Sequence, residues 1–256
     1  MLELSLGGKE LNHFELLTKQ SGRWSMVTDP LFKLDCKRVA DDDSFFPFEE
    51  ILDQVTSVFV SDSWVQTNAE YRVHEPVVDP LHGVSVPLCG VQPFLGFVNY
   101  IAPLCYLFQR PEPMYFTFRM MWCRYWCRLN CIRSHQQTLL PLCRMFEELL
   151  QAHEPQLFYH LLKLGVNPLQ LAFPWIQLAF TDTFEVEQVL LLWDRILGFD
   201  NLNVLPVLAA ALFAFRSESL MAAEDAAEVN EIMSEFKRIK VVPLLQHFLF
   251  SDAPQA

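Results

Sequence analysis

The sequence predicts an all-α fold, and three observations lead to that prediction. Apolar residues recur at helical spacing along most of the chain, whereas the alternation typical of strands is nearly absent. Hydrophobic residues make up 52% of the 256 residues, with 22 Phe, which is ample for a sizeable core and too apolar for disorder. No internal repeat or low-complexity segment is present. We therefore expect a globular domain built from many short and medium-length helices.

The first helix that the periodicity predicts spans residues 47–62. Its apolar residues follow the i, i+3, i+4, i+7 spacing that makes one face, and Pro47 lies in its first turn. The later helices are predicted at residues 94–108, 112–133, 136–152, 155–164, 168–180, 183–197, 201–218, 224–239 and 241–250.

Three residues mark predicted helix ends in the C-terminal half. Gly165 and Gly198 each follow a periodic segment, so we expect both to end a helix in the left-handed conformation. Asp182, with Glu185 three residues later, is expected to cap the N-terminus of the helix that follows.

Residues 66–92 form a long internal loop in this interpretation, because no periodicity holds there and five Pro and Gly residues punctuate the segment. Such a loop is either a binding loop or an inserted segment. The uncharged stretch at 80–109 follows, and a membrane span needs about 20 apolar residues. Because several Pro and Gly residues interrupt it, we expect a buried core helix and no transmembrane segment.

Charge and cysteine content indicate the class of partner and the compartment. The net charge of −12 argues against nucleic acid as a partner and suits a partner with a local basic patch. Seven Cys without C-x-x-C spacing, and an N-terminus without a signal-peptide pattern, predict reduced thiols and a cytoplasmic location.

Two residue stripes on the predicted helix 112–133 have alternative interpretations. Cys123, Cys127 and Cys131 share one face and suit either a metal site or a packed core, and the core interpretation is favoured because zinc needs a fourth ligand. The arginines of this helix either grip an acidic partner or form ion pairs with a neighbouring helix such as that of Glu147 and Glu148.

The sequence contains no motif of a self-contained enzyme. It has no G-x-x-x-x-G-K-[ST] phosphate loop, no G-x-S-x-G elbow and no H-E-x-x-H zinc motif, and its His residues are scattered. We therefore expect neither a cofactor nor a bound metal.

A set of residues in the C-terminal half, however, follows the order of a known family. The order is His160-Leu161, Gly165, Pro168, Phe173-Pro174-Trp175, Phe180 and Leu191-Leu192-Trp193-Asp194. It resembles the TBC (Tre-2/Bub2/Cdc16) domain of Rab GTPase-activating proteins, and within that family it points to the group of TBC domain family member nineteen.

The resemblance implies an all-α TBC-type domain over residues 9–250, strongest at 94–216, with flexible ends at 1–8 and 251–256. The Arg-x-x-x-W motif that begins such domains is not found before Leu11, so the chain is expected to begin inside the usual domain, truncated at its N-terminal end. In the family, Trp175, Trp193 and Asp194 would be a structural signature.

The resemblance also implies a mechanism, and this sequence departs from it. TBC domains insert an arginine from an I-x-x-D-x-x-R motif and a glutamine from a Y-x-Q-G motif into the nucleotide site of a Rab, and an arginine of this kind is worth about 10³–10⁵ in rate. Asp62 and Gly96 remain from the two motifs. Val65 stands at the arginine position and Leu95 at the glutamine position, so both catalytic side chains are absent.

The resemblance thus implies a Rab regulator with impaired catalysis, whose peripheral membrane association would come only through the GTPase. Two alternatives stay open. The chain is a true activator if Arg72 and Gln92, which flank the degenerate motifs, supply substitute side chains. It is an interaction scaffold if it binds no GTPase at all.

Overall fold

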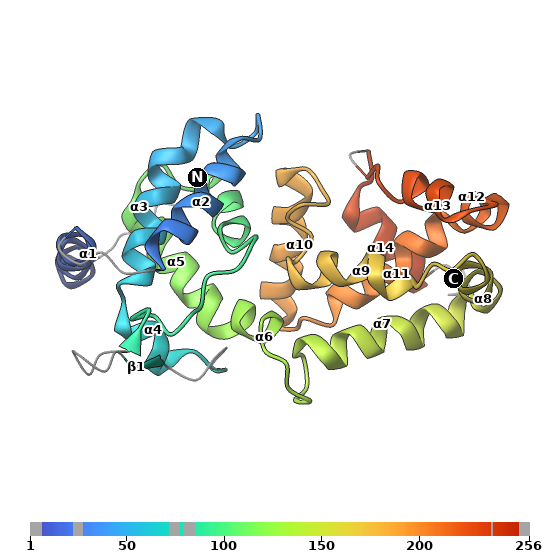
Figure 1. Ribbon diagram of the computed structural model, residues 1–256, viewed down its shortest axis with the longest axis horizontal. Helices are drawn as coiled ribbons and strands as arrows, with labels where there is room; N and C mark the ends of the chain where they lie inside the picture. Colours follow the sequence, from blue (N-terminus) through green and yellow to red (C-terminus); the bar gives the residue numbers. More distant parts are fainter. Residues whose placement is uncertain (1–6, 23–27, 72–76, 79–84, 237, 251–256) are drawn as a thin grey trace. The chain divides into compact units, whose positions relative to one another are not determined.

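The computed structural model describes residues 7–22, 28–71, 77–78, 85–236 and 238–250 (Figure 1). The chain divides into two compact units, residues 1–131 and 132–256, and each is described by itself. The predicted all-α fold is confirmed, with one pair of two-residue strands as the exception among the described residues.

Unit 1 contains six α-helices, two short strands and three 3₁₀ segments in its described residues. The helices are α1 (Gly8–Ser21), α2 (Asp29–Ala40), α3 (Glu49–Val60), α4 (Ser63–Asn68), α5 (Pro111–Met121) and α6 (Cys127–Leu129), and a π-helical turn at Trp122–Trp126 joins the last two. Strands β1 (Val77–Val78) and β2 (Ser85–Val86) pair antiparallel within the predicted loop 66–92, whose residues 72–76 and 79–84 lie outside the described residues.

Helix α3 is the central element of unit 1, and it packs against α1, α2 and α5 (Figure 1). The helix predicted at residues 47–62 is thereby confirmed, with a 3₁₀ turn at Phe46–Phe48 before it. Leu52, Val55 and Phe59 are fully buried on its apolar face. Phe59 lies within an aromatic cluster with Phe97, and their ring centroids are 5.4 Å apart.

The α-helix predicted at residues 94–108 is wrong in its geometry. The segment is buried, as predicted, but it forms two 3₁₀ helices, Val98–Tyr100 and Ala102–Tyr106. Pro103 explains the difference, because a proline in this position lacks an N–H group and its ring would clash with the carbonyl four residues earlier. None of the described helices is both long and apolar enough to cross a membrane.

The regular secondary structure of unit 2 consists of α-helices alone in the residues that are described. Its helices are α7 (Leu139–His153), α8 (Pro155–Lys163), α9 (Pro168–Gln177), α10 (Val186–Phe199), α11 (Val204–Phe215), α12 (Ser217–Ala222), α13 (Ala226–Ile232) and α14 (Val241–Phe250). Helix α11 is apolar on nearly every face and packs against α7, α9 and α14, which is the pattern expected of a buried helix.

One of the three helix-end predictions in this unit is confirmed, and two are wrong. Gly165 follows α8 with φ of 77°, as expected of a glycine that ends a helix. Gly198 lies inside α10, and Asp200 takes the left-handed conformation instead. Helix α10 begins at Val186 with Glu185 at the N-cap position, so Asp182 is not its cap.

All seven cysteines are buried, which agrees with the core interpretation of the Cys stripe: Cys123 lies in the π-turn, Cys127 begins α6 and Cys131 follows it. Burial disfavours the thiolate and raises six thiol pKa values. The pKa rises from an ordinary 9.0 to about 12 at Cys36, Cys89, Cys105 and Cys123, and to about 11 at Cys127 and Cys143.

These pKa values predict that the free energy of unfolding falls as pH rises above about 9. Below that pH the thiols are protonated in both states, whereas between about 9 and 11 only the unfolded chain releases their protons. Each thiol should then contribute a slope of about 1.4 kcal/mol per pH unit. Urea unfolding at a series of pH values checks this, and Cys89→Ala should reduce the slope by one thiol's share; an unchanged slope in that variant would contradict the assignment.

Candidate functional site

The acid of the first motif, Asp62, lies at the junction between two helices of unit 1. Helix α3 ends at Val60 and α4 begins at Ser63, so Asp62 is the N-cap of α4, and its side chain accepts a hydrogen bond of 3.0 Å from the Trp64 backbone N–H. Asp62 is only 2% exposed. A carboxylate this deeply buried requires further partners, because an unpaired buried charge is costly.

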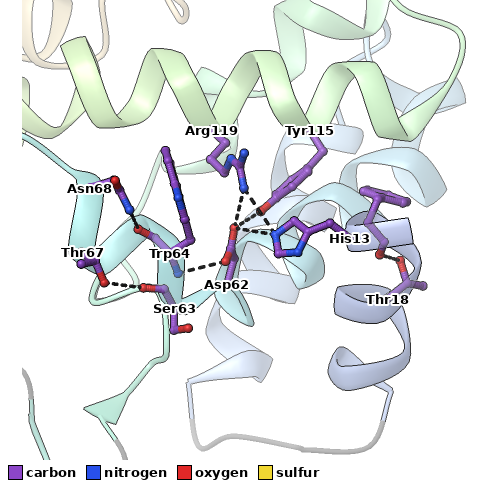
Figure 2. A network of polar contacts seen from close by, with 10 residues as sticks. His13, Thr18, Asp62, Ser63, Trp64, Thr67, Asn68, Tyr115 and Arg119 are labelled. Carbon is purple, nitrogen blue, oxygen red and sulfur yellow. Dashed lines mark hydrogen bonds and ion pairs between the residues drawn. The ribbon is translucent and has the colours of Figure 1, made fainter. Parts of the chain in front are cut away.

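Three side chains from two other helices supply these partners (Figure 2). The Nη1 atom of Arg119 lies 3.2 Å from Asp62 Oδ2, and the Tyr115 hydroxyl donates a short hydrogen bond to the same oxygen. His13 Nε2, from α1, lies 4.0 Å away. Burial, followed by the charge of Asp62, raises the pKa of Tyr115 well above its ordinary value, so Tyr115 stays a hydrogen-bond donor.

Arg119 is enclosed by aromatic rings as well as paired with Asp62. Its guanidinium carbon lies 4.1 Å from the centroid of the Trp64 ring and 4.7 Å from that of Phe116, within cation–π range. The side chain is 13% exposed, and its Nε atom is buried without a hydrogen-bond partner in the described part of the chain. An arginine, Arg119, therefore lies beside Asp62, but its contacts with Asp62 and Trp64 keep its side chain inside unit 1.

Val65, which the motif resemblance predicts at the position of the family's arginine, is fully buried in α4, three residues after Asp62. A valine here contributes apolar contacts to the core, and burying it is worth about 1.5–3 kcal/mol. A charged side chain in the same rotamer would be placed in the core without a partner.

Leu95, which the motif resemblance predicts at the position of the family's glutamine, has the opposite environment, since 75% of its surface is exposed. It lies on a turn in which Gly96 has φ of 93°. The carboxylate of Asp35 on α2 holds this turn, because its two oxygens accept the backbone N–H groups of Gly96 and Val98 at 2.9 and 2.8 Å. Arg38 Nε lies 3.2 Å from Asp35, which compensates the buried charge.

Residues 87–92 precede the Leu95 turn and pack against the end of α3 and against α4. The Cys89 N–H donates to the Val60 carbonyl at the end of α3 at 3.2 Å. Gly90 has φ of 73°, and a Cβ atom there would lie 2.8 Å from Cγ of Gln66 on α4, so the segment packs closely on that helix. Gln92 follows and is half-buried, whereas Arg72 lies outside the described residues.

The predicted signature residues lie in unit 2. Trp193 is buried and its indole N–H donates to the Ala179 carbonyl at 3.3 Å. Trp175 packs on Phe236 with ring centroids 5.2 Å apart. Asp194, the third predicted signature residue, is exposed on α10.

Sequence reasoning missed two elements of this site. It did not find Asp35, because nothing in the sequence links that residue to a turn about sixty residues later. It singled out the arginines of residues 112–133 but gave them the wrong partners: Arg119 pairs with Asp62 and Arg128 with Glu70, while Glu148 pairs with Arg144. Among the described residues, no group of His, Cys, Asp and Glu is placed to hold a metal ion.

A model of the Rab-GTPase-TBC domain matches residues 93–221, which is slightly more than half of the chain. The match includes the Leu95 turn and the Trp175 and Trp193 helices. The chain therefore belongs to the Rab-GTPase-TBC domain family, and the resemblance noted from its motifs is confirmed.

Two individual proteins are similar to this chain in sequence. The chain is 39% identical to human (Homo sapiens) TBC1 domain family member 19 over 260 residues, which cover 98% of this chain and 49% of the relative. It is 26% identical to TBC1 domain family member 2A of Bos taurus over 187 residues, which cover 68% of the chain and 19% of that protein. The chain thus spans about half the length of the first relative and less of the second.

The Asp62 network predicts a strong effect of Asp62→Ala on stability. The substitution leaves the guanidinium of Arg119 buried without its counter-charge, which should lower the free energy of unfolding by about 3–5 kcal/mol. Glu148→Ala is the matched control, because it breaks a pair with Arg144 whose side chains are 62% and 80% exposed and should cost less than about 1 kcal/mol. Urea unfolding checks both, and equal losses would show that the Asp62 pair is not special.

The Asp35 contacts predict a local effect at the Leu95 turn. Asp35→Ala removes the acceptor of two backbone N–H groups, each worth about 1–3 kcal/mol when left unsatisfied. Amide hydrogen exchange should accelerate at Gly96 and Val98, while Asp53→Ala on α3 should leave both amides protected. Unchanged exchange in Asp35→Ala would contradict the role assigned to this carboxylate.

Proposed function

We propose that this chain is a regulator of Rab small GTPases that binds the GTPase while contributing little or nothing to GTP hydrolysis. Membership of the Rab-GTPase-TBC family supports the partner class. The side chains at positions 65 and 95 support the loss of catalysis, and they are the observation on which the proposal depends.

The chemical argument concerns the transition state. Acceleration of GTP hydrolysis needs a cation near the charge that develops on the transferring phosphoryl group and a polar group that orients the attacking water. Val65 has no charge, and Leu95 can neither donate nor accept a hydrogen bond. With both replaced, the remaining surface can bind a GTPase but has no group at these positions that acts specifically in the transition state.

The environments of the two positions add to this argument. Val65 is fully buried, so the chain uses the arginine position for core packing. Leu95 is exposed, so its side chain is available for an apolar contact with a partner. Arg119 is a poor substitute for the missing arginine, because Asp62 and the ring of Trp64 already hold its guanidinium.

A role of this kind places the chain in membrane trafficking. We propose that it acts in the cytoplasm and reaches membranes through the Rab it binds, competing there with effectors of the same GTPase. In the alternative, Gln92 and Arg72 replace the missing catalytic side chains and the chain is an activator with unconventional residues.

The test is single-turnover GTP hydrolysis by a panel of purified Rabs, with and without a molar excess of the folded chain, followed by a pull-down with each Rab in its GTP and GDP states. We expect no acceleration and binding that depends on GTP. Acceleration that disappears in Arg72→Ala/Gln92→Ala would overturn the proposal in favour of an unconventional activator. The absence of binding to every Rab would favour the scaffold.

A surface substitution probes the binding role of the Leu95 turn. Leu95→Asp should weaken GTP-dependent Rab binding by about tenfold or more, because it places a desolvated charge in the interface. Leu249→Asp, which changes another exposed leucine, should leave binding unchanged. Thermal unfolding should be close to the parent chain in both variants; equal binding by both would show that Leu95 does not contact the GTPase.

A further inference from the structure

Unit 2 contains a pocket of about 570 Å³ that the proposed function does not use. The end of α11, the segment before α14 and the first turns of α14 form its walls. Its volume lies within the range of small-molecule sites. The basic residues that line it are Arg216, Arg238 and Lys240, together with His247.

The charge of this pocket is opposite to that of its surroundings. Unit 2 has eight basic residues against fifteen acidic ones, yet three of the eight line this one pocket. Within the described residues, no carboxylate forms an ion pair with any of the three. Glu235 is the acidic residue of the lining, and its backbone carbonyl accepts a hydrogen bond of 3.0 Å from Arg216 Nη2.

Arg216 is held in the wall of the pocket. Its side chain is half-buried against the ring of Phe215, with the guanidinium carbon 5.6 Å from the ring centroid. Its Nε atom is buried and has no hydrogen-bond partner in the part of the chain that is described. The Nε atom is closed off from the pocket, so a ligand would meet the Nη end of the guanidinium, whose charge an anion in the pocket would balance.

We propose that this pocket binds a small ligand carrying two or more phosphate groups, of the inositol-phosphate type. Two guanidinium groups and one ammonium group suit several phosphate oxygens at once, because arginine binds phosphate through two parallel hydrogen bonds. Phe215, Pro243 and Leu244 give the pocket an apolar wall against which a sugar-like ring packs. The volume of this half-open pocket suits a compact ligand.

The phosphate groups have two possible sources, a soluble inositol polyphosphate and the headgroup of a membrane lipid. Helix α14 has a feature that favours the lipid headgroup as the source. His247 lines the pocket, and Phe250, three residues further along the same helix, is 65% exposed. An exposed aromatic residue one turn from a phosphate site suits the interface of a membrane. The inference is independent of the proposed Rab binding, because it rests on residues of unit 2 alone.

The test uses the full chain and three probes: inositol trisphosphate, unphosphorylated inositol, and phosphatidylcholine vesicles with or without phosphatidylinositol bisphosphate. Calorimetry follows the soluble probes and co-sedimentation follows the vesicles. The variant is Arg238→Glu/Lys240→Glu, which reverses two exposed charges of the pocket. The matched control is Arg133→Glu/Lys163→Glu, which makes the same change in net charge at exposed positions of unit 2 outside the pocket lining.

We expect the trisphosphate to bind and unphosphorylated inositol not to bind. The pocket variant should lose affinity by about tenfold or more, while the control variant should bind as the parent does. Co-sedimentation only with the phosphoinositide vesicles would identify the lipid headgroup as the source, and binding of the soluble probe alone would identify the free polyphosphate. Absence of binding to both, or equal losses in the two variants, would overturn the proposal.

Discussion

The buried carboxylate of Asp62 connects three parts of unit 1, and the arrangement of the first motif depends on its ion pair with Arg119. The carboxylate caps α4 through Trp64, receives the hydroxyl of Tyr115 from α5 and lies beside His13 of α1. Because removing one member of such a network leaves another charge or donor unpaired, the members hold one another in place. Asp62 thus links the first turn of α4, which carries the buried Val65, to Arg119 of α5.

Val65 and Leu95 differ in their exposure to solvent and in what holds the backbone around them. At position 65 the valine packs in the core. Asp62, the N-cap of the same helix, pairs with Arg119 of α5. At position 95 the leucine adds nothing to stability through burial, and Asp35 holds its turn through backbone groups alone. Burial therefore favours an apolar side chain at position 65, whereas position 95 is open to solvent.

Local patterns predicted the fold class and most helices, while contacts between distant segments decided what the sequence could not reveal. Helix α3 was predictable because one apolar face repeats along it. The segment 94–108 was predicted as an α-helix from its apolar residues, yet it forms 3₁₀ helices around Pro103, and its Val98 N–H donates to the distant carboxylate of Asp35. The site residues Val65 and Leu95 were identified from motif register, but their opposite exposure depends on tertiary packing. The partner of Arg119 lies 57 residues away in sequence, so no spacing rule indicates it.

Loss of catalysis need not entail loss of binding, because the two depend on different groups. A catalytic side chain acts on charge that exists only in the transition state, whereas affinity for the GTP-bound Rab comes from contacts present in the ground state. A chain that keeps the second set without the first occupies the GTPase in its active form and excludes other proteins from the same surface. Such a complex would keep activators away from the Rab while its own slow hydrolysis continues, and the dissociation rate would set how long this exclusion lasts.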